Sequence, residues 1–496
     1  MKIQLKVRSQ KSRITAIIIN FNESNNKLRK KATAAVTLKM ILPALICIIL
    51  LVGPVSQAKM GWEQADKILS RIKAPTFPNK DFNITDYGAV GNGTTICSNA
   101  INKAISAANK AGGGRVVVPA GTFLTGAIYL KSNVNLYISE GAVVKFSNDP
   151  NAYLPAVYTR WEGIECMNYS PLIYAFKEQN IAITGKGTLD GQGANWWSWK
   201  RTPKRREDRT KLFDQGRDGT PVKERQYGGK SLSPNMIEPC KCKNILIEGI
   251  KIINGPFWHI HPVLSQNITV RNVRVNGSGP NNDGCDPESC KDVIIEGCYF
   301  NTGDDCIAIK SGRNNDARRV NVPSENIIVR NSEMKAGHAG VAIGSEITSG
   351  TRNVFVEKCI MDDPNLDHAI RLKTNSVRGG FMENVYVRNV TVGQVKGAVL
   401  LVDFFYQDIE KGNYKPIARN INMENVTSKK SKYALYLRGL ENAPITDVRL
   451  KNCTFDNISD PNISVISNVK NLVLENVKLN GKLVSNPAET KTEIKK

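Results

Sequence analysis

The chain has 496 residues, a hydrophobic content of 41% and a formal net charge of +23. This length can bury a large core, and this hydrophobic content is ordinary for a soluble protein. The positive charge favours a polyanionic partner, although charge alone does not distinguish nucleic acid, anionic lipid and acidic polysaccharide. The cysteines lack the spacing of a zinc site, even at Cys240 and Cys242. We therefore predict no metal and no cofactor.

Residues 1–58 are predicted to be a secretory signal region. The apolar run Met40–Val52 follows basic residues and precedes Ser56-Gln57-Ala58, where a signal peptidase would cut after Ala58. A retained transmembrane anchor is the alternative, but the run is shorter than the ~20 apolar residues that span a bilayer, and Pro43 interrupts it. We expect a secreted or periplasmic protein with no stable membrane insertion after cleavage.

Export permits disulfides. Cys285 and Cys290 are close enough in sequence to be a candidate pair, whereas most other cysteines lie in apolar runs that indicate buried thiols.

Two helices are predicted near the start of the mature chain. Trp62–Lys73, within an N-terminal segment at 59–80, is a short amphipathic candidate. Ala100–Ala111 is rich in alanine and ends at Gly112, which predicts a helix that caps the first coil of the following domain.

Residues 81–486 repeat one pattern, an Asn or Asp followed by an alternating apolar pentad. The pentads have the period-two pattern of short strands, and no helical pattern fills the intervals between them. Asn244 and Asn267, for example, begin units 23 residues apart. Strands that recur once per coil predict an all-β fold, a parallel β-helix whose stacked coils bury a continuous core. The units begin at Asn180, Asn244, Asn267, Asp292, Asn326, Asn353, Asn384, Asn420, Asp447 and Asn471.

Equivalent Asn residues in such a stack can form a ladder of amide hydrogen bonds. The alternative fold, an antiparallel sandwich, would require tight hairpin signals such as Asn-Gly between neighbouring strands, and these are scarce. Lys200–Lys230 is basic, polar and without periodicity, so it is predicted to be an inserted loop, solvated rather than in contact with substrate. Export argues against a nucleic acid partner for this segment, and the charged tail 487–496 is predicted to be disordered.

Acidic residues interrupt the apolar pattern at two places that are one coil apart. Asp283 lies 21 residues before Asp304, so the two should occupy neighbouring rungs about 5 Å apart. Asp304 and Asp305 would point to opposite faces of a regular strand, so we expect a turn at Gly303 that lets both face the outer groove. Crowding of like charges should raise the pKa of one carboxyl group, which would keep it protonated as a general acid.

Further along, His338 follows Gly337, and Arg371 and Lys373 alternate with the apolar Ile370 and Leu372. Period two places Arg371 and Lys373 on the outer face. Each feature alone is common as a turn, a surface histidine or a solvated strand face. Their recurrence near whole-coil spacings favours one site, in which carboxylates hydrolyse a glycosidic bond and cations bind a uronic acid carboxylate.

The four motifs together resemble those of the polygalacturonase family, glycoside hydrolase family 28. The resemblance extends from about Phe82 to Asn457 and looks similar to bacterial members that act on chain ends. It implies a right-handed parallel β-helix that hydrolyses α-1,4-linked galacturonic acid with inversion. The motifs are Asn281-Asn282-Asp283, Gly303-Asp304-Asp305, Gly337-His338 and Arg371-Leu372-Lys373, with Asn282, Ala339 and Leu372 at positions where the family usually has Thr, Gly and Ile.

The resemblance also implies residue roles. Asp304 would be the general acid, Asp283 and Asp305 would activate water, and His338 would tune the acid and contact substrate. The substrate-binding residues would be Asn281, Arg371, Lys373 and Tyr406. Inversion should require carboxyl groups far enough apart to admit a water molecule. The expected partner is homogalacturonan, and the expected oligomeric state is a monomer.

Three other functions remain open. A rhamnogalacturonan hydrolase would share the fold, although Arg371 and Lys373 favour galacturonate at the cleavage site. A pectate lyase would require calcium and would release an unsaturated product. A non-catalytic β-helix adhesin or glycan-binding module would not need three aspartates in register.

Overall fold

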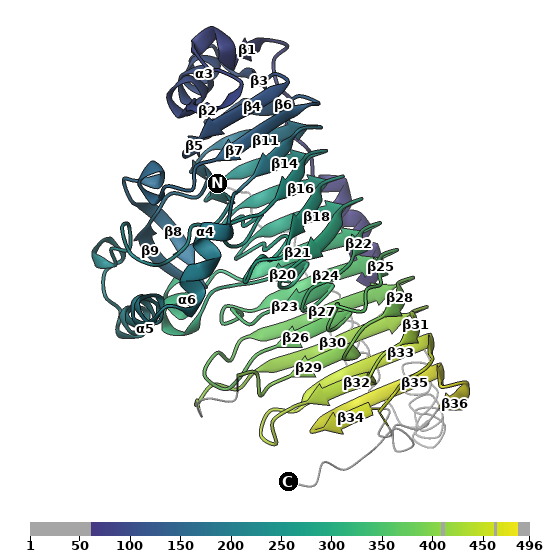
Figure 1. The fold of residues 1–496 in the computed structure, drawn as a ribbon. Helices are drawn as coiled ribbons and strands as arrows, with labels where there is room; N and C mark the ends of the chain where they lie inside the picture. Colours follow the sequence, from purple (N-terminus) through teal and green to yellow (C-terminus); the bar gives the residue numbers. More distant parts are fainter. Residues whose placement is uncertain (1–60, 408–411, 461–463, 485–496) are drawn as a thin grey trace, which may run out of the picture. The chain divides into compact units, whose positions relative to one another are not determined.

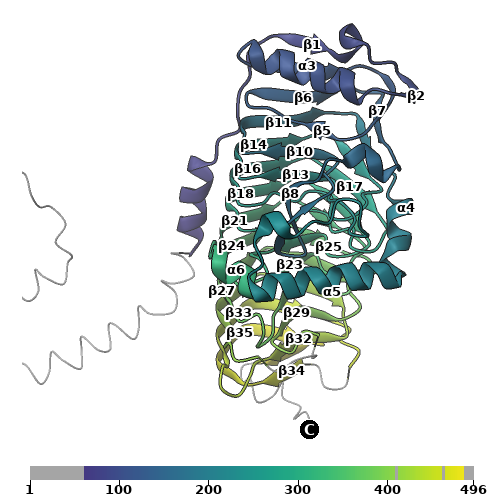
Figure 2. The same cartoon turned by 90° about the vertical axis from the view of Figure 1, so that its left-hand side faces the viewer.

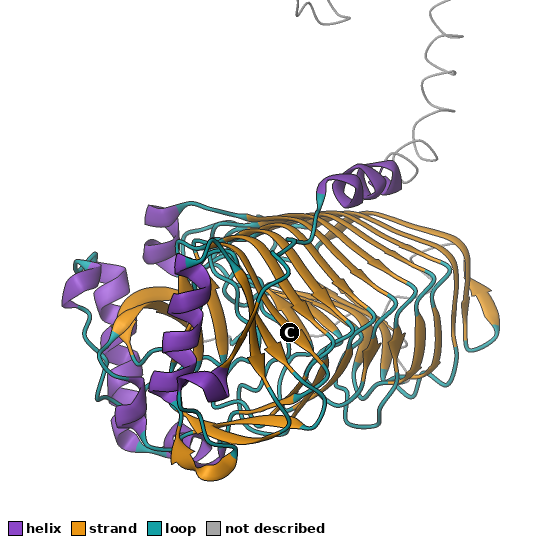
Figure 3. Cartoon of the chain, turned by 90° about the horizontal axis from the view of Figure 1, so that it is seen from above, coloured by secondary structure: helices purple, strands orange, loops and turns teal. Residues whose placement is uncertain are grey.

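The computed structural model describes residues 61–407, 412–460 and 464–484. The predicted signal region and the predicted C-terminal tail lie outside these residues. The chain is a right-handed parallel β-helix, which confirms the predicted fold class (Figure 1). Seen from above in Figure 3, the strands of successive coils lie side by side in a staggered series.

The coils contribute three rows of strands. In each of the first two rows, every strand pairs in parallel with the next. The first row is β1 (Asp81–Asn83), β3 (Gly114–Val118), β6 (Val134–Ile138), β11 (Gln179–Gly185), β14 (Lys243–Glu248), β16 (Gln266–Arg271), β18 (Lys291–Glu296), β21 (Ser324–Arg330), β24 (Thr351–Glu357), β27 (Phe381–Arg388), β30 (Ile417–Glu424), β33 (Ile445–Phe455) and β35 (Val469–Leu479). The second row is β2 (Asn92–Ile96), β4 (Gly121–Thr125), β7 (Ala142–Phe146), β12 (Thr188–Asp190), β15 (Lys251–Ile253), β17 (Arg274–Gly277), β19 (Tyr299–Thr302), β22 (Glu333–Met334), β25 (Ile360–Met361), β28 (Thr391–Gln394) and β31 (Thr427–Lys430).

The third row carries the residues of the predicted site. Single bridges through Ile260 and Cys285 join its early strands to its later ones. Two pairings are antiparallel. One is the hairpin of β8 (Val157–Trp161) and β9 (Ile164–Asn168), which stands apart from the rows, and the other joins β36 (Lys482–Val484) to β35 at the end of the first row. The third row is β5 (Ile128–Tyr129), β10 (Ile173–Phe176), β13 (Ile237–Cys240), β20 (Ile307–Ile309), β23 (Val341–Ile343), β26 (Ile370–Lys373), β29 (Ala398–Asp403), β32 (Tyr433–Arg438) and β34 (Ser464–Ser467).

The predicted amide ladder is present. Asn353 donates from Nδ2 to Oδ1 of Asn326 at 2.9 Å and accepts from Asn384 at 3.0 Å. These residues also have positive φ angles, 60° at Asn353. Asn and Asp tolerate this left-handed conformation better than other residues with side chains, so one residue type meets both the backbone and the hydrogen-bonding requirement.

Two helices match the predictions for the N-terminal part. Helix α3 (Ser98–Lys110) caps the first coils and buries Ile101 and Ile105 against them. Residues 61–71 form a second helix, which lies along the outside of the first row (Figure 2). It packs on Ile328, Phe355 and Tyr386, apolar side chains that the first row directs away from the core.

The prediction of a structureless loop at Lys200–Lys230 was wrong. The short helix α4 (Ala194–Trp197) precedes this insertion, and the insertion itself contains the longer α5 (Pro203–Asp218). Thr202 caps α5 by accepting a hydrogen bond from the Arg205 amide, and Gly219 ends the helix in the left-handed conformation. The apolar periodicity is missing because α5 is held mainly by buried charged groups, Arg205 and Asp208 among them.

The candidate pair Cys285 and Cys290 does not form a disulfide. All ten cysteines of the described residues are buried free thiols. The Cys290 thiol donates to the Pro262 carbonyl oxygen at 3.2 Å, so it is satisfied within the core. Among the described residues, no helix has both the length and the apolar character needed to cross a lipid bilayer.

Candidate active site

The turns that lead into the third row bring the three predicted aspartates together. Asp283 lies between β17 and β18, and Asp304 and Asp305 lie between β19 and β20. One oxygen from each carboxyl group can be chosen so that all three lie within 4.8 Å of one another. The chain bends at Gly303 and Asp304 before β20 begins, as the sequence predicted, so neither aspartate enters the core.

This spacing does not support the argument for inversion that was made from the sequence. Inverting hydrolases usually hold their carboxyl groups about 6.5–9.5 Å apart, whereas retaining enzymes hold them about 5–5.5 Å apart. The stereochemical outcome therefore remains a prediction from the family resemblance. Three acidic groups this close could also hold a cation, and the expectation of no metal likewise stays a prediction.

His338 contacts the first aspartate of the pair. Its Nδ1 lies 2.8 Å from Oδ1 of Asp304, and the Asp305 amide also donates to that oxygen at 2.9 Å. Gly337 allows this approach because a side chain there would begin 2.4 Å from the Asp304 carbonyl oxygen. Burial opposes the charge of Asp304, but the hydrogen bond from His338 and the positive charges of His338 and Lys373 outweigh burial, so the pKa of Asp304 lies below its usual value.

Asp283 has the opposite shift. It is 2% exposed, and burial together with the neighbouring charge of Asp304 raises its pKa to about 8, against the opposing charge of Lys310. The sequence predicted one raised pKa in the cluster and assigned the proton to Asp304. In the structure the raised pKa belongs to Asp283 instead, because His338 pairs with Asp304 whereas Asp283 is buried beside the Asp304 charge.

The predicted cation pair is divided between two roles. Lys373 is buried, and its Nζ lies 2.6 Å from Oδ2 of Asp305, so the ammonium group forms an ion pair with that carboxylate. Arg371 is more accessible, with its Nη1 3.9 Å from Asp305. The Tyr406 ring lies beside both, 5.6 Å from the Arg371 guanidinium carbon and 5.4 Å from the Lys373 ammonium.

A buried charge network beneath the aspartates was missed. Lys310 Nζ lies 3.5 Å from Asp283, 3.9 Å from Asp286 and 3.3 Å from Glu346. Lys310 directly follows β20, and it is in register with Lys373 at the end of β26. Comparison of Ile307-Ala-Ile-Lys310 with Ile370-Arg-Leu-Lys373 could have identified it. No sequence signal pointed to Glu346.

The aspartates open into a cavity of about 400 Å³, here called the acid pocket. Asn281 and Tyr406 line it, as do Arg205, Arg206 and Arg209 from α5. The insertion that the sequence assigned to solvent therefore contributes to the site. The cationic residues that line the acid pocket are Lys200, Arg205, Arg206, Arg209, Lys310, Arg313 and Lys373, together with His338.

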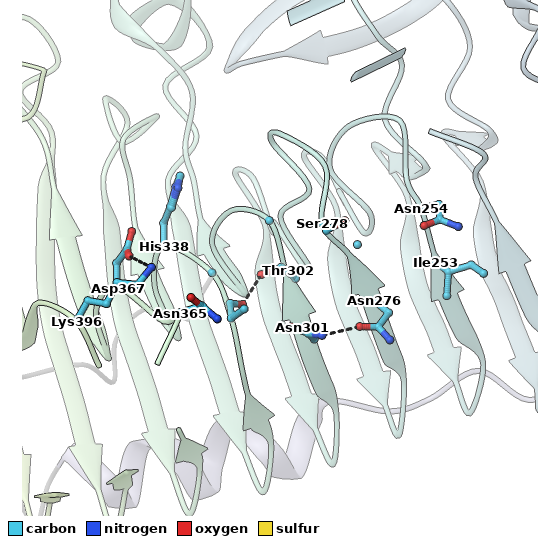
Figure 4. Close-up of a pocket in the computed structure, with 14 residues that line it drawn as sticks. Ile253, Asn254, Asn276, Ser278, Asn301, Thr302, His338, Asn365, Asp367 and Lys396 are labelled. Atoms are coloured by element: carbon cyan, nitrogen blue, oxygen red, sulfur yellow. Dashed lines mark hydrogen bonds and ion pairs between the residues drawn. The ribbon is translucent and has the colours of Figure 1, made fainter. Parts of the chain in front are cut away.

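A second cavity, of about 600 Å³, lies beside the first and is here called the amide groove. It follows the ends of the second row, where successive coils present Asn254, Asn276 and Asn301 (Figure 4). His338 lines both cavities.

Comparisons with known proteins agree on one family. The family model described as glycosyl hydrolases family 28 matches residues 110–478. A probable polygalacturonase of Vitis vinifera is 30% identical over 389 residues, covering 75% of this chain and 73% of that protein. An exo-poly-alpha-D-galacturonosidase of Dickeya chrysanthemi is 27% identical, covering 66% of this chain and 58% of that protein. The crystal structure of a hyperthermoactive exopolygalacturonase from Thermotoga maritima superposes with a TM-score of 0.82 at 42% identity, covering 86% of this chain and 97% of that one.

Proposed function

The chain belongs to the glycosyl hydrolases of family 28, and we propose that it hydrolyses α-1,4-galacturonosidic bonds in homogalacturonan. The observation that carries this proposal is the juxtaposition of three carboxyl groups with a cavity that is rich in Lys and Arg. Carboxyl groups can supply general acid and base catalysis of glycoside cleavage. The surrounding cations complement a polymer that carries one carboxylate per sugar.

Asp304 is the proposed general acid. It gives its proton to the glycosidic oxygen as the bond from that oxygen to the anomeric carbon breaks. Asp283 and Asp305 orient a water molecule, whose oxygen bonds to the anomeric carbon while its proton passes to one of the two carboxylates. Asn281, Arg371 and Tyr406 bind the sugar, and Lys373 holds Asp305 in place through their ion pair.

His338 is proposed to control where the proton of the cluster resides. It pairs with Asp304, which disfavours protonation of Asp304. Its side chain is 48% exposed, so an incoming substrate can reach it. When a substrate oxygen takes the His338 hydrogen bond, the pKa of Asp304 rises, and the proton that Asp283 holds can move to the acid.

We propose action at chain ends. Arg205, Arg206 and Arg209 from α5 line the acid pocket together with Glu162, which lies at the turn of the β8–β9 hairpin. A helix and a hairpin placed over this part of the site suit a terminal sugar better than a polymer that continues in both directions. The proposed setting is the exterior or the periplasm, with pectin as substrate, no nucleic acid partner and a monomeric enzyme.

The first test is the time course of products from polygalacturonic acid. The proposal predicts saturated reducing ends with monomer or dimer appearing from the start, whereas mixed oligomers would indicate internal cutting. An unsaturated, ultraviolet-absorbing product would indicate a lyase. Proton NMR that identifies the first anomer formed decides whether the configuration at the anomeric carbon inverts.

The second test removes the acid. Asp304→Asn should lower kcat at least about a thousandfold, because a proton donor is lost while the shape of the side chain is kept. Asp447→Asn is the matched control, since Asp447 only accepts a ladder hydrogen bond from Asn471 and an amide oxygen can do the same. Equal activity of the two variants would exclude Asp304 as the acid, and a wild type without hydrolysis of any pectic polymer would favour a glycan-binding protein.

A further inference from the structure

Aromatic side chains cluster on the outer face of the third row, several coils before the catalytic turns. Tyr129 on β5 and Tyr174 on β10 occupy paired positions, and the Phe176 ring stacks on that of Tyr174 with the centroids 6.3 Å apart. Tyr158 of β8 adds a ring whose centroid lies 5.5 Å from that of Phe176. Figure 2 shows β5, β10 and β13 following one another down the stack, with β8 beside β13. Three of these rings, Tyr129, Tyr158 and Phe176, are partly exposed, and contiguous apolar surface of this kind marks interaction sites.

Two exposed lysines lie over these rings. Lys241 Nζ is 4.2 Å from the Tyr158 centroid, and Lys177 Nζ is 5.3 Å from the Phe176 centroid. An ammonium group has three donor hydrogens, so the contact with a ring leaves donors available. Within the part of the chain that the structure describes, neither lysine forms an ion pair. The partly exposed rings and these two lysines are here called the lysine–aromatic surface.

The carboxylates near this surface already have cationic partners. Glu178 Oε1 lies 3.3 Å from Lys131 Nζ. Glu165 accepts a hydrogen bond from the Tyr158 hydroxyl, which fixes that ring, and Glu165 Oε1 lies 3.9 Å from Arg160. The two lysines of the surface therefore carry positive charge that the surrounding acidic groups do not balance, and an anionic ligand complements it.

Strand β8 connects this surface to the acid pocket. Tyr158 is near the start of β8, whereas Glu162, at the turn after β8, lines the acid pocket. Four residues of strand span about 14 Å, so the two places are close but distinct. No residue of the lysine–aromatic surface is among the described residues that line the acid pocket. Thr159 donates to Glu238 at 2.6 Å in the buried layer beneath, which holds β8 and its Tyr158 in a fixed position.

We propose that the lysine–aromatic surface is a second, non-catalytic binding site for an anionic polysaccharide. That the polysaccharide is homogalacturonan rests on the proposed function. The apolar face of a sugar ring can lie against an aromatic side chain while its carboxylate accepts hydrogen bonds from an ammonium group. A polymer held at this surface has a raised effective concentration at the active site, which lowers KM for long chains. A trisaccharide spans little more than the active site, so its cleavage does not depend on the second site.

Binding is measured by affinity electrophoresis through gels that contain polygalacturonic acid. The double variant Lys177→Gln, Lys241→Gln is compared with the control Lys429→Gln, Lys430→Gln, which removes two exposed lysines from β31. Both are made with Asp304→Asn, so that the polymer is not cut. We expect the first double variant to bind about tenfold more weakly than the control. Equal binding would overturn the inference, and equally strong retardation of the Asp304→Asn protein by polyglutamate would overturn the assignment to a polysaccharide.

Kinetics of the otherwise wild-type enzyme separate the two sites. The double variant Lys177→Gln, Lys241→Gln should raise KM for polygalacturonic acid about fivefold and leave kcat/KM for trigalacturonate unchanged. Phe176→Leu, which keeps an apolar side chain and removes the ring, should raise the same KM about threefold. Lower activity on trigalacturonate, or a change in the mass of the double variant by light scattering, would overturn the inference, because the surface would then support the active site or a second copy of the chain. Polymer binding by a wild type that hydrolyses no pectic substrate would instead refute the proposed function.

Discussion

Lys310→Met would show how the buried cation sets the protonation of the catalytic carboxyl groups. Lys310 is 3% exposed, and it is the ammonium shared by Asp283, Asp286 and Glu346. Both carboxylate oxygens of Asp286 lack a hydrogen-bond partner. The Lys310 ammonium therefore balances the charge of Asp286 as well as that of Asp283. Its removal should make the cluster take up a proton at higher pH.

The geometry gives the size of the effect. Unit charges separated by the 3.5 Å between Lys310 Nζ and Asp283 Oδ2 interact by ~5 kcal/mol at an effective dielectric constant of about 20. One pKa unit corresponds to about 1.4 kcal/mol, so this is an upper bound of roughly three units. Glu346 competes for the same ammonium at 3.3 Å. We therefore expect the acid limb of the profile to move up by about one to two pH units.

The assay is kcat/KM on polygalacturonic acid between pH 4 and pH 9. Loss of Lys310 also leaves buried carboxylates unpaired, which can cost about 3–5 kcal/mol of stability, so folding must be checked by circular dichroism. Glu346→Gln is a second variant, and its expected pH shift has the opposite sign. It removes a negative charge from the network and should move the acid limb to lower pH. An acid limb of the pH profile that stays at the wild-type pH in both folded variants would refute the role of this charge network in setting carboxyl protonation.

Three further predictions concern stability. Asn353→Ala should cost about 2–4 kcal/mol, from two ladder hydrogen bonds and a left-handed backbone that alanine disfavours, and chemical denaturation should find Asn353→Gly less destabilised. The pKa of Asp283 is about 8 in the folded protein and lies above its unfolded value of about 3.9. The stabilisation from protonated Asp283 is therefore complete below pH 4 and is lost as pH rises through 8. Asp283→Asn should gain stability relative to wild type between pH 5 and pH 9, and a stability difference that stays constant over this range would contradict the shift. Trp62→Ala should cost about 2 kcal/mol and speed hydrogen exchange in 61–71, because the ring packs on Phe355 and the Arg388 guanidinium carbon lies 3.7 Å from its centroid.

The sequence by itself determined the coil architecture and most members of the site. A strand period of two and a recurring Asn specify the stack, because the αL position and the ladder both require that residue type. Once the coils are in register, residues at equivalent turns must meet, which is why Asp283 and Asp304 could be placed on neighbouring rungs. The cap at Ala100–Ala111 followed from ordinary helix signals.

Only the tertiary structure decided how charge is distributed in the site. The alternation that puts Lys373 outside the core does not reveal that Asp305 lies 2.6 Å from it. The sequence did not reveal that the raised pKa belongs to Asp283, since the pKa of a carboxyl group depends on its burial and on the partner that the fold supplies. Helix α5 was missed because ion pairs hold it in place, with little apolar periodicity to reveal it. Local pattern determines backbone structure, whereas electrostatics depends on distances between residues that are far apart in the chain.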